Sequence, residues 1–343
     1  MSAPRLSIVI ATLNRARFIG ETLQSIVGQL TPEVEILVLD GASNDGTEQV
    51  VQGIAARCPQ LRYVRQEKNH GVDRDFDRAV ELAAGTYCWL MTDDDLLKPG
   101  AVAAVLLGLK PNPSLLLVNA EVKDLGMAEV IEPSRLGFSD DRTYGPDELS
   151  RLFAEVGAYI TFIGSVVVDR ALWLSRAREP YFGTLFIHVG VLFQKPLPRP
   201  ALVLGTPWIS IRYGNAMWRP RDFEIWMFKW PELVWSFEAI SEAAKETVYP
   251  KEPWRNLKRL FFFRAKGTYS LEDYARFIAP RAQSPLMRLA ARAVATVPGP
   301  LANAAAMGWL KFVDPSHGRW LSDTRASRFY YRNLARGRRK TSR

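Results

Sequence analysis

The N-terminal third of the chain repeats one pattern: a short β-branched apolar run, then a polar or glycine-containing loop, then apolar residues at helical spacing. This pattern predicts strands at 6–11, 35–40, 61–64 and 87–91, and helices at 19–27, 48–57, 75–84 and 101–109. Short strands that alternate with helices in this way are typical of an α/β fold with a mostly parallel, doubly wound sheet flanked by helices. Further strands are predicted at 115–118, 162–169 and 208–213.

The character of the chain changes after residue 215. Tryptophans recur among Phe and Leu with Lys and Arg between them, and no strand-like alternation remains. We therefore expect residues 1–215 to form the α/β domain and residues 216–343 to form a mainly helical C-terminal extension.

Charge is divided unequally along the chain. Residues 1–200 hold 20 Lys and Arg against 25 Asp and Glu, whereas residues 201–343 hold 25 against 11. Such a basic region is typical of proteins that meet a membrane surface, a phosphate-bearing lipid or nucleic acid. The alternative is a solvated basic face with a disordered tail at 336–343.

No stretch of the sequence reaches the roughly 20 uninterrupted apolar residues that a membrane-spanning helix needs. The best candidate, 286–313, is broken by Arg288, Arg292 and two prolines, so it is expected to lie on a bilayer surface or to form two core-packing helices. Cys58 and Cys88 support neither a disulfide framework nor a zinc site. Since the N-terminus also predicts a strand rather than a signal peptide, a cytosolic protein is expected.

Three consecutive carboxylates, Asp93, Asp94 and Asp95, follow the apolar run 87–91. Neighbouring carboxylates repel one another and raise each other's pKa, and a divalent cation relieves this repulsion. Because magnesium is typically held by one or two carboxylates together with substrate phosphates, a pair of these aspartates at a strand end is a suitable site for Mg²⁺ or Mn²⁺ against a diphosphate. The alternatives are a helix N-cap at Asp95 or a plain acidic loop.

Two further polar loops follow strands at the same predicted edge of the sheet. Asp40 begins a glycine-containing loop that includes Ser43, and its carboxylate can accept hydrogen bonds from a nucleobase or a ribose. Thr12, Asn14 and Arg15 form the loop after the first strand. Open α/β sheets bind ligands where strands end, so these loops favour a nucleotide site. The alternatives are a plain Asp/Gly turn and a helix N-cap with a solvated arginine.

Taken in order, these segments resemble the family 2 glycosyltransferases over roughly residues 5–110. LSIVIATLNR matches the opening strand and loop of that family, LDGASNDGT its VDDGSTDGT-like segment, EKNHGVDRDFDRAVELAAGTY its N-x-G to A-x-G stretch, and LMTDDD its D-x-D-type motif. The resemblance implies a GT-A fold, a nucleotide-sugar donor and a divalent cation. Two departures stand out: Asp40-Gly41 replaces the usual pair of acids, and Asp75-Phe76-Asp77 stands where many members have Ala-Arg-Asn.

The loops and the resemblance together give a set of predicted donor-binding residues. The residues predicted to bind the nucleotide sugar are Thr12, Asn14, Arg15, Asp40, Ser43, Arg74, Asp93 and Asp94. By the resemblance, Asp93 and Asp95 bracket the metal and the diphosphate, and the adjacent Asp94 is counted with the catalytic residues.

Transfer with inversion needs a base that takes the proton of the acceptor hydroxyl. By the resemblance, many members use a carboxylate in the region beyond the D-x-D motif, where this chain has Phe186-Ile187-His188-Val189. An imidazole has a reference pKa of about 6.5, so His188 is the predicted base. The alternatives are a packed structural histidine, a third metal ligand, or a base at Asp75, Asp169 or Glu179.

The segments FIGSVVVDRALW and FIHVGVL also show a weaker similarity to the abequosyltransferase-like enzymes of O-antigen assembly. Farther along the chain, Arg212, Asn215 and Trp218 follow or end a strand-like run and are predicted to bind the sugar or phosphate of the acceptor. The alternative is that this Trp-rich region is simply core.

The predicted function is metal-assisted transfer of a sugar from a nucleotide diphosphate sugar to a glycan or polyprenyl-phosphate-linked acceptor in cell-surface polysaccharide synthesis. We expect it at the inner face of the cytoplasmic membrane, with no nucleic-acid partner. A sugar nucleotidyltransferase is the first rival, but residues 12–18 lack the glycine-rich loop that it needs. A non-catalytic module that binds anionic lipid or nucleic acid is the second, and it leaves the aspartates without a purpose.

Overall fold

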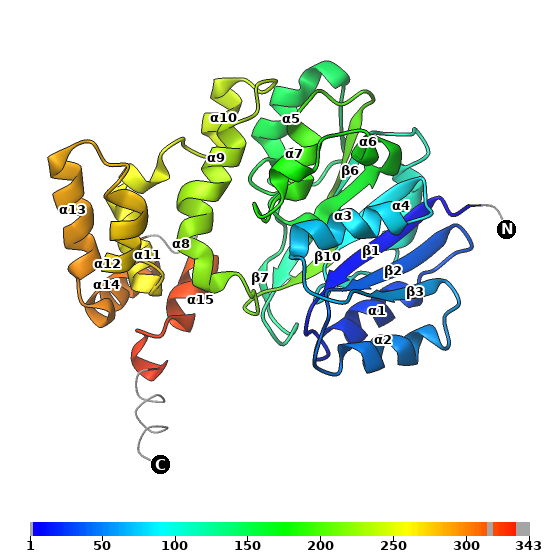
Figure 1. Cartoon of the computed structure of the whole chain (residues 1–343), viewed down its shortest axis with the longest axis horizontal. Helices are drawn as coiled ribbons and strands as arrows, with labels where there is room; N and C mark the ends of the chain where they lie inside the picture. The colour runs from blue at the N-terminus through cyan, green and yellow to red at the C-terminus, as the bar shows by residue number, and fades with distance from the viewer. Residues whose placement is uncertain (1–2, 314–317, 334–343) are drawn as a thin grey trace, which may run out of the picture. The chain divides into compact units, whose positions relative to one another are not determined.

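The computed structural model describes residues 3–313 and 318–333, which form two compact units (Figure 1). Unit 1 comprises Met1–Tyr213 and Trp235–Val248, and unit 2 comprises Gly214–Val234 and Tyr249–Arg343. The sequence predicts one boundary at 215/216, whereas the structure also places Trp235–Val248 in unit 1, since α10 (Glu242–Val248) packs on α5 (Leu149–Val156). The tail at 336–343 lies outside the described residues.

Unit 1 is built on a ten-stranded sheet of order β3-β2-β1-β4-β9-β6-β10-β5, with β7 paired to β6 and β8 paired to β10. Its strands are β1 (Leu6–Thr12), β2 (Val34–Asp40), β3 (Leu61–Arg65), β4 (Tyr87–Met91), β5 (Leu96–Leu97), β6 (Leu115–Lys123), β7 (Val130–Glu132), β8 (Arg142–Tyr144), β9 (Val166–Asp169) and β10 (Ala201–Arg212). β1 to β4, β6 and β10 run in one direction, and the other strands run against them. The predicted α/β class with a mostly parallel sheet is confirmed.

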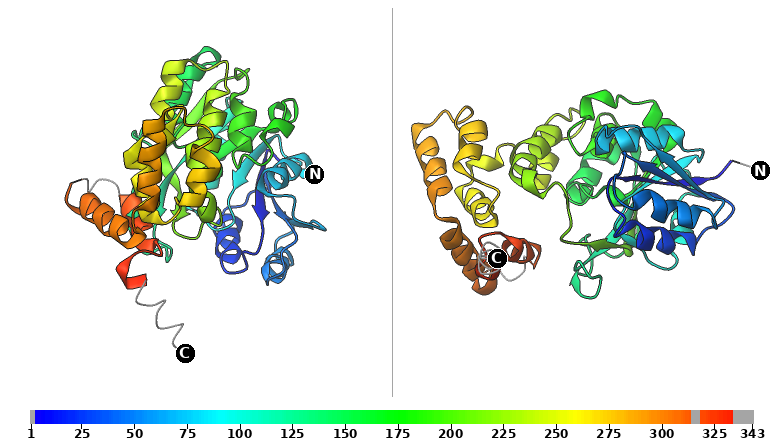
Figure 2. Two further views of the ribbon diagram at one scale, coloured as in Figure 1. Left: turned by 60° about the vertical axis from the view of Figure 1, so that its left-hand side comes forward. Right: turned by 60° about the horizontal axis from the view of Figure 1, so that its bottom comes forward.

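Helices cover both faces of the parallel part of this sheet (Figures 1 and 2). α1 (Ile19–Val27) and α2 (Thr47–Ala55) pack together on one face, and α3 (Val72–Leu82) packs on β1 and β2 from the other. The first two helices connect strands that step toward β3, whereas α3 leads from β3 back to β4, and right-handed crossovers therefore place them on opposite faces. Because both faces are covered, β1 and β4 are buried along their whole length, which explains their continuous apolar sequences.

Several predicted elements have different bounds in the structure. The strand predicted at 208–213 is the end of the longer β10, and the strand predicted at 115–118 continues to Lys123 as β6. The strand predicted at 162–169 begins only at Val166, because Ile163–Ser165 form a 3₁₀ turn whose Gly164 carbonyl accepts a hydrogen bond from Trp89 Nε1 at 2.8 Å. The resulting β9 runs antiparallel to β4 and β6. The helix predicted from 75 begins earlier, at Val72, directly after Gly71, whose φ of 89° suits glycine.

The remaining helices of unit 1 connect the later strands. They are α4 (Ala101–Gly108), α6 (Arg170–Leu174) and α7 (Ile187–Phe193). The ends of β1 and β2 lie side by side, with Thr12 paired to Asp40, and β4 ends next to β1. The loops after these three strands therefore meet at one edge of the sheet, as the sequence predicts.

Unit 2 is helical. Its helices are α8 (Asp222–Glu224), α11 (Leu257–Lys266), α12 (Leu271–Asp273), α13 (Pro285–Thr296), α14 (Gly299–Phe312) and α15 (Gly318–Ala326), with the start of α9 (Trp230–Trp235). Phe223, Trp254, Phe263 and Tyr269 belong to its core. Among the residues that the structure describes, no helix is both long and apolar enough to cross a membrane.

Candidate active site

The three aspartates that follow β4 are buried at the edge where the parallel strands end. Asp93, Asp94 and Asp95 are between 2% and 9% exposed. Burial and the neighbouring Asp94 raise the pKa of Asp93 to about 7, although the Arg15 guanidinium lies 3.3 Å from it and lowers the pKa. The same two causes raise the pKa of Asp95 well above its usual range. The positive charge nearby therefore does not compensate these carboxylates.

β10 and the turn itself hold Asp95 in place. The Thr92 hydroxyl donates to Oδ2 at 2.5 Å, and the backbone N–H of Arg212 donates to Oδ1 at 2.7 Å. The Arg212 side chain continues the connection, because Nε donates to the Asp94 carbonyl at 2.9 Å and Nη2 pairs with Glu21 on α1. The position of the acidic turn is thus fixed by a strand that lies far away in the sequence.

The loop after β1 is joined to the loop after β2. The backbone N–H of Asn14 donates to Ser43 Oγ at 2.8 Å, and Asn14 Oδ1 accepts from the N–H of Asn44 at 2.8 Å. Asn14 has a φ of 55°, a conformation that Asn tolerates better than most residues. From the same loop, Arg15 reaches Asp94 Oδ2 at 3.6 Å as well as Asp93. Three loops from three strands therefore form one connected site.

Asp40 anchors the second of these loops. Its buried carboxylate accepts hydrogen bonds from Tyr63 Oη at 2.6 Å and from the N–H of Ser43 at 2.7 Å. Burial and the bond to Asp40 raise the pKa of Tyr63 well above its ordinary value, so the phenol stays protonated and donates. Sequence reasoning missed Tyr63, since a tyrosine within a strand carries no motif.

The start of α3 closes on the Asp40 loop. Asp75 Oδ1 accepts from Gln66 Nε2 at 2.6 Å, and Asp75 Oδ2 lies 2.8 Å from where a β-carbon on Gly41 would stand. Burial raises the pKa of Asp75, with a smaller contribution from Asp40. The sequence presents Asp75 as a departure from the family pattern and as an alternative base, and the structure shows that it packs directly against the loop after β2.

The three loops of this site lie within a segment that matches a known family model. Residues 7–167 match the family model described as "Glycosyl transferase family 2". The match includes β1 to β4 and every loop described above. Residues 7–167 belong to glycosyl transferase family 2.

The family 2 domain has several similar curated relatives. The chain is 28% identical to abequosyltransferase RfbV of Salmonella typhimurium over 61% of this chain and 63% of the relative. It is 29% identical to the GalNAc(5)-diNAcBac-PP-undecaprenol beta-1,3-glucosyltransferase of Campylobacter jejuni over 30% of this chain and 34% of the relative. These matches span less than two thirds of each relative's length. The similarity to RfbV agrees with the resemblance of FIGSVVVDRALW and FIHVGVL to abequosyltransferase-like enzymes.

Solved structures share the fold of the family 2 domain at low sequence identity. Staphylococcus aureus TarS in complex with UDP has a TM-score of 0.57 and 17% identity, and the alignment covers 94% of this chain and 89% of that chain. The mannosyltransferase PcManGT from Pyrobaculum calidifontis, in complex with GDP-Man and Mn²⁺, has a TM-score of 0.54 and 16% identity, with 97% and 88% covered. These likenesses confirm the GT-A-like fold.

The aspartates within residues 7–167 are suited to a divalent cation whose remaining ligands are the oxygens of a diphosphate. Among the described residues, no three His, Cys, Asp or Glu side chains come together as a metal-holding cluster. Magnesium does not need such a cluster when substrate phosphates supply the other ligands. The raised pKa values of Asp93 and Asp95 are the electrostatic condition that a cation relieves, and each Asp95 oxygen keeps a lone pair beyond the hydrogen bond that it accepts.

The predicted base, His188, lies on α7 in the interior of unit 1 and is 1% exposed. Its Nε2 is 2.8 Å from the Ile160 carbonyl, which can only accept, so Nε2 carries the proton and Nδ1 keeps its lone pair. Within the described part of the chain, Nδ1 has no hydrogen-bond partner. Burial lowers the pKa of His188 to about 4, so the imidazole is neutral.

Two charged side chains, Asp73 and Arg176, bind the two ends of α7. No sequence pattern predicts either contact. At the N-terminal end, the Asp73 carboxylate accepts from the N–H groups of Gly183, Leu185 and Ile187 at 2.8 to 3.3 Å. At the C-terminal end, the buried Arg176 guanidinium donates to carbonyls that include those of Val191 and Leu192, at 2.9 and 2.6 Å. This arrangement matches the helix dipole at both ends and fixes the segment that carries His188.

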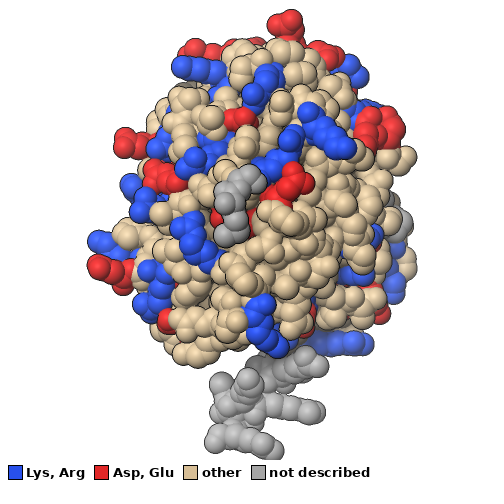
Figure 3. Space-filling model, turned by 90° about the vertical axis from the view of Figure 1, so that its right-hand side faces the viewer, with Lys and Arg blue, Asp and Glu red and all other residues tan. Residues whose placement is uncertain are grey.

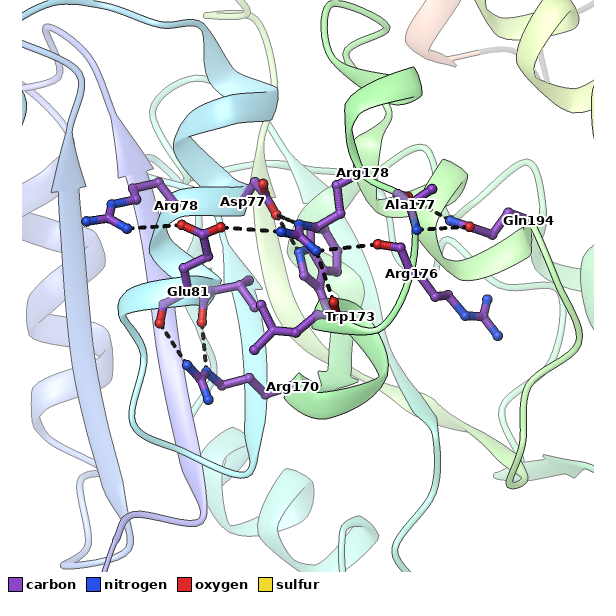
Figure 4. Close-up of polar contacts among 11 residues, drawn as sticks. Asp77, Arg78, Glu81, Arg170, Trp173, Arg176, Ala177, Arg178 and Gln194 are labelled. Atoms are coloured by element: carbon purple, nitrogen blue, oxygen red, sulfur yellow. Dashed lines mark hydrogen bonds and ion pairs between the residues drawn. The ribbon is translucent and has the colours of Figure 1, made fainter.

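Arg74 lies on α3, with its guanidinium 4.2 Å from the centre of the Phe182 ring. It lines a polar cavity of about 680 Å³ between α3 and residues 176–182. Figure 4 shows the wall of this cavity, where Asp77 accepts from Trp173 Nε1 at 2.8 Å and pairs with Arg178 at 2.8 Å. The structure thus places Arg74 beside the segment that leads to α7.

The three predicted acceptor residues are divided between the two units. Arg212 belongs to unit 1, where its guanidinium contacts the turn of the aspartates. Asn215 and Trp218 belong to unit 2, and Trp218 is 43% exposed with its ring edge-on to Trp226. The acceptor role of these residues stays a prediction.

Proposed function

We propose that the protein transfers a sugar from a nucleotide diphosphate sugar to a glycan or lipid-linked acceptor in cell-surface polysaccharide synthesis, assisted by Mg²⁺ or Mn²⁺. The observation that carries this proposal is that hydrogen bonds and an ion pair join the loops of Thr12, Asp40 and Asp93 at one edge of the sheet, within the segment that matches family 2. Open α/β sheets bind nucleotides at this edge.

The proposed donor site divides its tasks among the loops. The loops of Asn14 and Ser43, which are tied to each other, give the nucleoside a fixed surface, and Asp40 offers its carboxylate from a position set by Tyr63. Arg15 neutralises part of the charge beside the aspartates and lies where a diphosphate would meet them. Preorganised groups of this kind avoid reorganisation during the reaction.

Asp93 and Asp95 would hold the cation, and Asp94 lies between them. When bound, the metal ion neutralises the charge that develops on the leaving diphosphate. The chain's own contribution is to keep the carboxylates in place through Thr92 and Arg212, so that they are ready before the donor arrives.

We assign the general base to His188. Its support is the lone pair at Nδ1, which takes part in no hydrogen bond with the described residues, and the fixed tautomer set by the Ile160 carbonyl. Proton transfer requires that the acceptor hydroxyl reach Nδ1, and contact with the hydroxyl and solvent would raise the pKa from its buried value. Asp73 and Arg176 position this segment without touching the reacting groups.

The acceptor class is proposed from the relatives. RfbV is named an abequosyltransferase, and the name of the Campylobacter enzyme describes an undecaprenol-linked glycan. A polyprenyl-phosphate-linked glycan at the inner face of the cytoplasmic membrane is the corresponding acceptor here, with Arg212, Asn215 and Trp218 as the predicted contacts.

Thermal unfolding with UDP, GDP, CDP and dTDP, each with and without Mg²⁺ or Mn²⁺, tests the donor site. We expect one nucleotide to raise the melting temperature by several degrees, and more with metal than without, because ligands that bind only the folded state stabilise it. The nucleotide sugar that contains this nucleotide should then be turned over. No stabilisation by any nucleotide, together with no turnover of any nucleotide sugar, would show that the proposal is wrong.

A further inference from the structure

The long helix α14 of unit 2 is apolar on two opposite faces. One face carries Ala302, Ala306 and Leu310, which are buried in a cluster with residues of α11. The other face is exposed, and its apolar residues recur at helical spacing over the whole length of the helix. These residues are Leu301, Ala304, Ala305, Trp309 and Phe312. A helix that only packs on its own unit would place polar residues on this outer face.

The preceding helix α13 repeats this feature. It buries Ala291 and Ala295, while Leu286 is 76% exposed and Leu289 is 67% exposed. α13 and α14 follow one another around a short turn, and both pack on α11 (Figures 1 and 2). Within α14, Leu301 is 65% exposed and Phe312 is 78% exposed, so both helices present large apolar side chains to solvent. Contiguous exposed apolar surface marks an interaction site.

Charge distinguishes this helix pair from the rest of the surface. From Tyr274 to Val313 the sequence contains no Asp or Glu, and it carries four arginines and Lys311. Two lysine side chains lie beside the exposed rings, with Lys258 Nζ 4.8 Å from the Trp309 ring and Lys311 Nζ 5.3 Å from the Phe312 ring. By contrast, Lys and Arg are interspersed with Asp and Glu over the face drawn in Figure 3.

We propose that the exposed faces of α13 and α14 form a docking surface for a bilayer that contains anionic phospholipid. Leu, Phe and Trp side chains enter the boundary between headgroups and acyl chains, while Lys and Arg reach the lipid phosphates. A second copy of the chain fits less well, because α13 and α14 carry Arg288, Arg292 and Lys311 but no Asp or Glu, so two copies would bring like charges together. The inference goes beyond the proposed sugar transfer and does not depend on it.

Co-sedimentation of the full-length chain with liposomes tests this surface. We expect binding to vesicles of phosphatidylcholine mixed with phosphatidylglycerol, weak binding to phosphatidylcholine alone, and weaker binding as salt is raised. The double substitution Trp309→Ser and Phe312→Ser should lower the affinity for the anionic vesicles at least tenfold. Leu107→Ser is the matched control, because Leu107 is 62% exposed on α4 of unit 1 and should be dispensable.

Two further measurements keep the test decisive. Circular dichroism should show an unchanged melting curve for the double variant, since both side chains are exposed. Sedimentation equilibrium without lipid should give the mass of a monomer for both proteins. Unchanged liposome binding by the double variant would overturn the proposal, and so would a dimer that the double substitution dissociates. Neither result depends on whether the protein transfers a sugar.

Discussion

The aspartates after β4 and His188 on α7 are both buried, but burial shifts their pKa values in opposite directions. The carboxylates are crowded together, so burial and mutual repulsion raise the pKa of Asp93 to about 7. For His188, burial is the cause that lowers the pKa, to about 4. The acidic turn is therefore short of positive charge, whereas the histidine is a neutral group with one unused lone pair.

This difference shows how one fold can separate two chemical tasks. The turn gains from binding a cation, because the cation replaces protons that the carboxylates otherwise retain. α7 does not need a cation, because Asp73 and Arg176 already bind the backbone groups at its two ends. In the proposed reaction the donor and its metal bind at the sheet edge and the proton is removed at α7, so a substitution at one of these places should leave the other unchanged.

The largest effect is expected from Asp95→Asn. The amide keeps the size of the side chain but cannot offer two anionic oxygens, so we expect turnover to fall by about a thousandfold through loss of the metal's charge stabilisation. Turnover of the nucleotide sugar at saturating Mn²⁺ measures this. Asp140→Asn is the control, because the Asp140 side chain is 68% exposed and should leave turnover unchanged. An active Asp95→Asn variant would remove the metal from the proposal.

His188→Gln is expected to act on turnover without acting on the donor site. Glutamine can still donate to the Ile160 carbonyl, but it lacks a basic nitrogen, so kcat should fall by about a hundredfold or more. The dissociation constant of the nucleotide, measured by calorimetry, should stay the same. Unchanged kcat would assign His188 a structural role and move the search for the base to Asp75, Asp169 or Glu179.

The pH dependence of stability separates the histidine from the carboxylates. The folded pKa of His188, about 4, lies below the reference value of the unfolded chain, about 6.5. The unfolded state therefore takes up the proton first, and stability that is present above pH 6.5 is lost as pH falls toward 4. We expect this loss to be about 2 kcal/mol larger in the native protein than in His188→Gln. Urea unfolding at pH 7 and pH 4.5 measures the difference, and equal losses would show that His188 is not buried in solution.

The sequence predicted β1 to β4 and the meeting of their loops at one edge of the sheet, because these depend on local patterns. Apolar runs, turn residues and the order of the loops are all visible within the first third of the chain. It could not predict the contacts that cross the fold. Arg212 reaches the aspartates from the far end of β10, and Asp73 reaches residues 183–187, since tertiary packing alone brings such groups together. The exposed faces of α13 and α14 likewise became visible only once their buried faces were known.

The smallest effect is expected at the contact between the loop after β2 and the start of α3. A β-carbon at Gly41 would stand 2.8 Å from Asp75 Oδ2, so Gly41→Ala must displace a carboxylate that Gln66 holds. We expect Gly41→Ala to destabilise the protein by about 1–2 kcal/mol and to raise KM for the donor more than it lowers kcat. Gly53 offers the matched control, since no atom lies within 4 Å of its β-carbon position in α2, and Gly53→Ala should stabilise the helix by about 0.5–1 kcal/mol. A Gly41→Ala variant with unchanged KM would place the nucleotide away from this loop and leave the aspartate turn as the remaining donor contact.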